Sequence, residues 1–162
     1  MSDTTVATRD VGTCGVVFPS CESLLKHRQP FLFVSQGVID KEDGSARCDY
    51  RFDEDAWFFE GHFPQAPIVP GVLVLEMAAQ TANTVLSARC ERPVKAYLVS
   101  VQNAVFKAPV GAGDTIVAHA RLMDGSQAQR KPVSGDFLRF KVSVRRDETV
   151  CMRGEVTLCL AE

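Results

Sequence analysis

The strongest constraint on the fold is a long apolar segment that begins after the last of three closely spaced prolines, at positions 64, 67 and 70. From position 71 the segment reads GVLVLEMAAQTANTVLS. At about 100° per residue, every polar side chain from Glu76 onward except two threonines lies on one narrow face, which holds Glu76, Gln80, Asn83 and Ser87. The pattern predicts a buried helix opened by Pro70-Gly71. A carboxylate on such a helix costs free energy unless it is paired or used, so Glu76 is a candidate functional group.

The rest of the chain is predicted to cover this helix. Before it, the sequence indicates a short helix over 20–26 and strands over 31–39 and 45–52. After it, apolar or alternating runs indicate strands over 95–108, 115–123, 137–145 and 150–160. One sheet wrapped around one helix satisfies this order, which predicts a single α+β domain over 20–162 after a flexible lead-in over 1–19. Because one sheet cannot cover the helix on all sides, we expect dimerisation through edge-to-edge sheet pairing.

Composition excludes several classes of protein. The chain of 162 residues carries a net charge of −2 and no basic block, which argues against a nucleic-acid partner. No apolar run reaches membrane-spanning length, and the N-terminus has no signal-peptide pattern. The six cysteines form no C-x-x-C pair and have no metal-ligand spacing with the three histidines. We therefore expect a cytoplasmic protein with free thiols and no bound metal.

A specific resemblance is carried by the segment GHFPQAPIVPGVLVLEMAAQ, from Gly61 to Gln80. It resembles the signature of the β-hydroxyacyl-acyl carrier protein dehydratases. Upstream, LLKHRQPFLFV (24–34) is similar to the Leu-Pro-His-Arg-Tyr-Pro-Phe segment of that family, and downstream FKAPVGAGDTI (106–116) is similar to its Phe-Lys-Arg-Pro-Val…Gly-Asp segment. The resemblance covers about residues 22–160. It implies the hot-dog fold, a curved antiparallel sheet around one long helix, assembled as a dimer or a trimer of dimers. It also implies a protein with no cofactor of its own, since phosphopantetheine belongs to the carrier protein.

The residues of this segment suit the dehydration of a 3-hydroxyacyl thioester to the trans-2-enoyl product. That reaction needs a base for the C2 proton, for which His62 is the candidate, and an acid for the departing hydroxyl, for which Glu76 is the candidate. Gly71 is expected to offer its backbone N–H to the thioester oxygen, and its missing Cβ leaves room for the substrate. Gln80, one turn after Glu76, is expected to orient the carboxylate. In the family the histidine and the carboxylate come from opposite subunits, which implies a site formed only in the dimer.

Departures from the family pattern affect the expected substrate rather than the catalytic pair. The dehydratase-isomerase branch carries aspartate at the position of Glu76, so isomerase activity is not expected. Ser35 and Ala108 replace residues usual in the family, and Asn83 and Ser87 make the helix face expected to line the acyl tunnel more polar. Housekeeping fatty acid synthesis and a specialised polyketide or polyene pathway both stay open.

Other interpretations of single residues and of the whole chain also stay open. Lys26, Arg28 and Lys107 are candidates for contact with an acidic acyl carrier protein, although surface charge is the default explanation. His27 is interpreted as structural or solvated, with a docking role for the carrier's phosphopantetheine as the alternative. A hot-dog thioesterase would use its acid to activate water. A non-catalytic carrier-binding subunit is the other alternative, although such a copy would be expected to lose His62 or Glu76.

Overall fold

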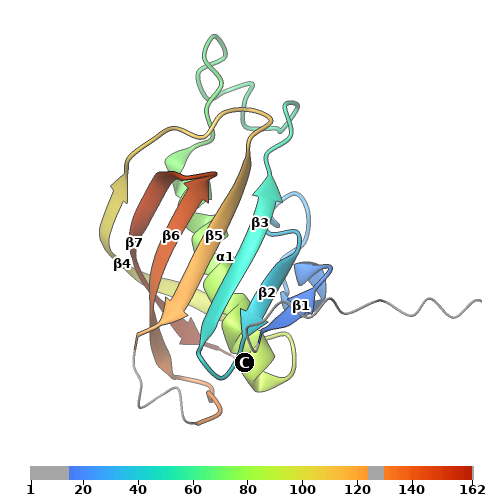
Figure 1. Ribbon diagram of the computed structural model, residues 1–162, viewed down its shortest axis with the longest axis vertical. Coiled ribbons are helices and arrows are strands. Elements are labelled where there is room, and N and C mark those ends of the chain that lie inside the picture. The colour runs from blue at the N-terminus through green and yellow to red at the C-terminus, as the bar shows by residue number, and fades with distance from the viewer. Residues whose placement is uncertain (1–14, 124–129, 162) are drawn as a thin grey trace, which may run out of the picture.

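The computed structural model describes residues 15–123 and 130–161, in which one curved antiparallel sheet wraps around one long helix (Figure 1). The helix, α1, spans Gly71–Cys90, and a short 3-10 helix, η1, spans Cys21–Leu24. The strands are β1 Val16–Phe18, β2 Gly37–Asp40, β3 Ser45–Arg51, β4 Ala96–Phe106, β5 Thr115–Leu122, β6 Phe137–Arg146 and β7 Thr149–Leu160. They lie in the order β1-β2-β3-β5-β6-β7-β4, which leaves β1 and β4 at the two edges.

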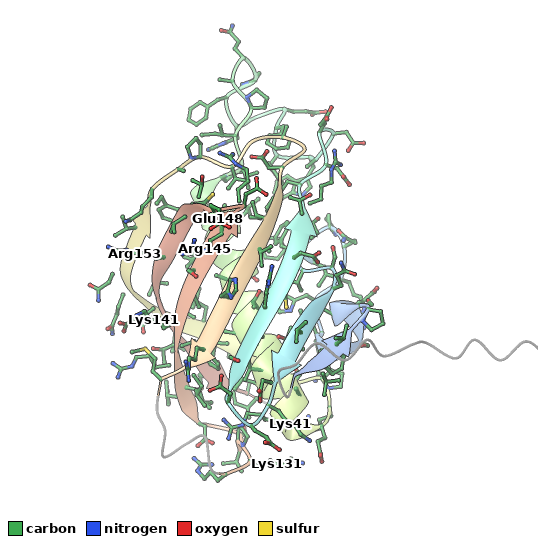
Figure 2. The ribbon with its side chains drawn as sticks, in the orientation of Figure 1. Lys41, Lys131, Lys141, Arg145, Glu148 and Arg153 are labelled. Carbon is green, nitrogen blue, oxygen red and sulfur yellow. The ribbon has the colours of Figure 1, made fainter. Side chains whose placement is uncertain are left out.

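The two faces of the sheet differ in the way expected of an antiparallel sheet with one solvated side. On β6, Phe140, Val142 and Val144 are buried against α1, while the residues between them are partly or fully exposed. Lys141, Arg145 and Arg153 lie on the face turned away from the helix (Figure 2). The alternation along β5 and β6, and along β7 from Val156 to Leu160, therefore fixes which face of each strand packs on the helix.

Helix α1 is buried along most of its length because the sheet and the segment 21–36 surround it. Its polar side chains have local partners. Thr81 Oγ1 donates to Met77 O at 2.9 Å, and Ser87 Oγ accepts the backbone N–H of Val94 at 3.2 Å. Glu91 caps the end of the helix, because its φ of 57° places it in the left-handed region and lets its N–H bond the last turn. Within the described ranges, no helix is both long enough and apolar enough to cross a membrane.

Most of the predicted elements are present, and two predictions need correction. The predicted strand over 31–39 is a strand only from Gly37, because the backbone of Phe31 and Phe33 bonds the Gln80 side chain instead of a neighbouring strand. Within the predicted lead-in, Val16–Phe18 form β1 and pair with β2. Residues 1–14 of that lead-in lie outside the described residues.

The second half of the polar helix face contacts the chain that follows the helix. Asn83 Nδ2 donates to Val94 O at 3.4 Å, and Ser87 bonds the N–H of the same residue. Both side chains are buried. These two side chains therefore hold the chain that follows the helix, while Asn83 Oδ1 is buried without a hydrogen-bond partner among the described residues. Their effect on the polarity of an acyl tunnel stays a prediction.

Candidate active site

His62 is held in one orientation by the turn that precedes α1. Its backbone N–H bonds Phe58 O at 2.9 Å, and its half-buried ring places Nδ1 2.9 Å from Ile68 O. A carbonyl oxygen can only accept, so Nδ1 carries the proton in this contact. In the neutral ring, the free lone pair is therefore on Nε2. This is the arrangement that a general base requires, with the tautomer fixed by the hydrogen bond of the other nitrogen.

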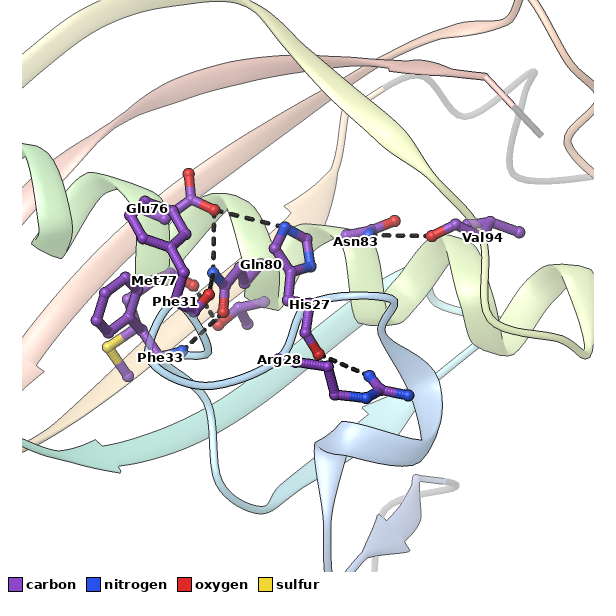
Figure 3. Close-up of polar contacts among 10 residues, drawn as sticks. His27, Arg28, Phe31, Phe33, Glu76, Met77, Gln80, Asn83 and Val94 are labelled. Atoms are coloured by element: carbon purple, nitrogen blue, oxygen red, sulfur yellow. Dashed lines mark hydrogen bonds and ion pairs between the residues drawn. The ribbon is translucent and has the colours of Figure 1, made fainter.

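Glu76 lies in the second turn of α1, with two nitrogen groups near the same carboxylate oxygen (Figure 3). Gln80 Nε2 donates to Glu76 Oε1 at 3.0 Å, and His27 Nε2 lies 3.6 Å from that oxygen. The Gln80 side chain is itself fixed, because it accepts from Phe33 N at 2.8 Å and donates to Phe31 O at 3.0 Å. The carboxylate is thus held at Oε1, while Oε2 has no hydrogen-bond partner among the described residues.

Gly71 is the first residue of α1 and borders an apolar cavity of about 270 Å³. The first N–H groups of a helix have no partner inside the helix, so the N–H of Gly71 is available to an acceptor. A Cβ added at this position would lie 3.1 Å from Phe106 Cε1. A side chain at this position would therefore press on the Phe106 ring, a contact that the sequence did not reveal.

The three candidate carrier-binding cations lie in two places. Lys26 and Arg28 belong to the segment that follows η1, beside His27, whereas Lys107 follows β4 and borders the apolar cavity next to Gly71. Arg28 Nη1 donates to Leu25 O at 2.8 Å and to His27 O at 2.6 Å, and Nε forms an ion pair with Glu22 at 3.5 Å. The structure thus gives Arg28 a role in holding its own loop.

His27 is the group at this site whose contact the sequence did not reveal. In the sequence, His27 is the middle residue of a cation-rich tripeptide, Lys-His-Arg, and it was interpreted as structural or solvated. The structure brings its imidazole to Glu76, which is far away along the chain. The similarity of residues 24–34 to a family segment was the only signal that this loop belongs near the site.

Within the described part of one chain, no hydrogen bond or ion pair joins His62 to Glu76. In the same part of the chain, no group of three histidine, cysteine or acidic side chains is arranged to hold a metal ion. The two candidate catalytic groups therefore have separate supports, His62 on the turn before α1 and Glu76 on the helix itself.

Comparison with known proteins identifies the family. The family model for ApeI-like proteins, described as ApeI dehydratase, matches residues 38–153. The chain belongs to this dehydratase family. It is similar to the 3-hydroxyacyl-[acyl-carrier-protein] dehydratase FabZ of Methylobacterium sp., with 36% identity over 126 residues that cover 73% of each chain. It is also 39% identical to the FabZ of Rhizobium leguminosarum bv. trifolii over 134 residues, which cover 82% of this chain and 81% of the relative.

Solved structures support the fold of this dehydratase. The dehydratase heterocomplex ApeI:P from Xenorhabdus doucetiae superposes with a TM-score of 0.71 at 14% identity, covering 88% of this chain and 91% of the other. The protein PH1136 from Pyrococcus horikoshii superposes with a TM-score of 0.62 at 19% identity, covering 86% and 92%. Identities this low inform only on the fold. The predicted hot-dog fold and the predicted membership of the dehydratases are confirmed.

Proposed function

We propose that the protein removes water from 3-hydroxyacyl thioesters bound to an acyl carrier protein and releases trans-2-enoyl thioesters. The observation that carries this proposal is the fixed tautomer of His62, because the bond from Nδ1 to Ile68 O leaves Nε2 as a base. The names of the curated relatives support the carrier-bound substrate. The chemistry needs neither a metal nor a redox cofactor, since it consists of proton transfers and the loss of water.

In this proposal, His62 Nε2 takes the proton from C2 of the acyl chain. The negative charge that develops on the thioester oxygen is stabilised by the N–H of Gly71, at the positive end of α1. Glu76, protonated on Oε2, gives its proton to the hydroxyl on C3, which leaves as water. The Oε1 atom stays bonded to Gln80 throughout, so that the acid keeps its orientation.

We further propose that the complete site forms in a homodimer, in which His62 of one protomer meets Glu76 of its partner. The support is the edge strand β4, whose unpaired edge carries exposed apolar side chains: Tyr97, Leu98, Val99, Val101, Val105 and Phe106. A long apolar edge of this kind is a template for pairing with a second chain. A trimer of such dimers agrees with the same edge pairing.

The acidic carrier is proposed to approach where Lys107 borders the apolar cavity beside Gly71. Lys26 and Arg28 offer a second basic segment, next to His27 and Glu76. Such exposed cations affect the association rate and its salt dependence more than the chemical step. The described cysteines are unpaired, which agrees with the cytoplasm as the proposed location.

Mass spectrometry of 3-hydroxyacyl carriers tests the reaction directly. The wild type is expected to remove one water from the acyl chain, and His62→Ala and Glu76→Gln are each expected to lower the rate by about 10²-fold or more. Release of free acid, with the carrier thiol exposed, would assign the protein to the thioesterases. Binding without turnover over a series of chain lengths would favour the non-catalytic interpretation.

A further inference from the structure

The imidazole of His27 lies beside the carboxylate that the reaction proposed above uses as its acid. His27 Nε2 is 3.6 Å from Glu76 Oε1, and the two side chains are 30% and 22% exposed. Figure 3 shows the ring and the Gln80 amide directed at the same oxygen. The separation exceeds a normal hydrogen bond, but catalytic contacts are often long without substrate and shorten in the reactive complex.

The other ring nitrogen defines how His27 is protonated. Its Nδ1 atom is buried and has no hydrogen-bond partner among the described residues. A buried N–H without an acceptor costs free energy, whereas an unused lone pair on a neutral ring nitrogen costs less. The favoured neutral ring therefore keeps its proton on Nε2, the nitrogen that faces Glu76.

The backbone around His27 is fixed independently of this contact. Arg28 bonds the carbonyl groups of Leu25 and His27, and Leu25 forms a β-bridge with Val94. The charged neighbour Glu22 is paired with Arg28, at 3.5 Å, and Lys26 is an exposed cation of the same segment. On the α1 side, the uncharged Gln80 amide holds the carboxylate. The imidazole and the carboxylate are thus brought together from two separately anchored segments.

We propose that His27 is a positioning residue that holds Oε1 of Glu76 and leaves Oε2 for the hydroxyl of the substrate. This inference rests on the proposed dehydration. When Glu76 gives up its proton, a carboxylate forms, and the N–H groups of His27 and Gln80 at Oε1 stabilise it. Proton delivery from Oε2 is thereby favoured in the transition state, where the carboxylate charge develops.

Substitutions at position 27 separate this role from a structural one. His27→Leu fills a similar volume without a donor and is expected to lower kcat about tenfold or more, with little change in KM. His27→Gln places an amide N–H near the position of Nε2 and is expected to recover most of the loss. His119→Gln, on the outer face of β5, is the matched control and should leave kcat and KM unchanged.

Unchanged kcat in His27→Leu, or a loss that appears only in KM, would overturn the proposal, since the latter would assign His27 to carrier docking. An equal loss of kcat in the Leu and Gln variants would overturn it as well. Nitrogen-15 NMR of the full chain tests the contact without turnover, at about pH 8, where an ordinary histidine is neutral. The Nε2-protonated form of His27 is expected in the wild type, and Glu76→Leu should reduce that preference. A ring protonated on Nδ1 would refute the contact, whereas a wild type that does not dehydrate would refute only the proposed function.

Discussion

At the scale of single residues, Glu76 is held by one contact within its own helix and by another from a distant segment of the chain. Glu76 and Gln80 share a helix, so their hydrogen bond follows from a spacing of four residues. The bonds from Gln80 to Phe31 and Phe33, and the approach of His27, join segments that are distant in the chain. Such contacts depend on the tertiary fold, and no local pattern encodes them.

The first prediction concerns the contribution of Gln80 to the free energy of unfolding. Its buried amide satisfies Phe33 N, Phe31 O and Glu76, so Gln80→Leu would leave backbone groups without partners. We expect a loss of about 2–4 kcal/mol in the free energy of unfolding, measured by urea denaturation. Thr84→Val is the matched control, because Thr84 Oγ1 donates back to Thr81 O within the helix and otherwise makes only a long contact of 3.9 Å with Cys48 Sγ among the described residues, and it should cost less than about 1 kcal/mol. Equal losses in the two variants would contradict the prediction.

Gly71 allows stability and catalysis to be separated. In Gly71→Ala the new Cβ would contact the Phe106 ring, which is exposed and can shift. The gain in helix propensity, about 0.5–1 kcal/mol, offsets part of this contact. We therefore expect the free energy of unfolding to change by less than about 1 kcal/mol. The turnover of 3-hydroxyacyl carriers should fall about tenfold or more, because the methyl group lies beside the proposed oxyanion donor. A large loss of stability would show that packing, and not the donor, explains this glycine.

At the scale of elements, alternation predicted the strands that have one face on the helix and one face in water. The bounds of β3, β5, β6 and β7 agree with the predicted ranges to within about two residues, in the usual margin for strand ends. The segment 31–36 was predicted as a strand because it is aromatic and apolar. Only residues 32–34 of this segment are buried, and Gln80 supplies hydrogen bonds that a β-ladder would otherwise give. A short apolar run does not reveal which of these environments it occupies.

His119, on the outer face of the sheet, is expected to make the stability of the fold depend on pH. His119 on β5 is paired across the sheet with Arg47 on β3. Burial, and then Arg47 and Arg145, lower the pKa of His119 below its ordinary value. As pH falls below about 6.5, the unfolded chain takes up a proton at this position that the folded protein resists. The folded state should therefore lose stability from this pH downward until the lowered pKa of His119 is passed.

Urea denaturation of the wild type and His119→Gln, at about pH 7.5 and about pH 5.5, measures this effect. The stability lost between the two pH values should be smaller in His119→Gln than in the wild type. Arg47→Gln should reduce the loss as well, because it removes a like charge opposite the ring. A wild type that loses no more stability than His119→Gln would contradict the assignment.

At the scale of the whole molecule, no hydrogen bond or ion pair joins the two candidate catalytic groups within the described residues of one chain, and β4 is an apolar strand at the edge of the sheet. The predicted fold already implied a second chain, because a single sheet was not expected to cover the helix on all sides. What the sequence of one chain lacked was the geometry between two chains. The proposed dimer explains why His62 and Glu76 are separate in one chain and why the β4 edge is exposed. Sheet pairing at β4 would cover this edge and bring a second copy to the helix.

Mixing two inactive variants tests this arrangement. If His62 of one protomer acts with Glu76 of its partner, a mixed dimer of His62→Ala and Glu76→Gln contains one intact site and one doubly damaged site. Random exchange of protomers should then restore about one quarter of the wild-type rate, since half of the dimers are mixed and each has one of two sites. Sites made within one chain would give no recovery, because every chain carries a defect. Sedimentation analysis of each variant should show the wild-type assembly, so that a lack of recovery counts against the shared site and not against pairing through β4.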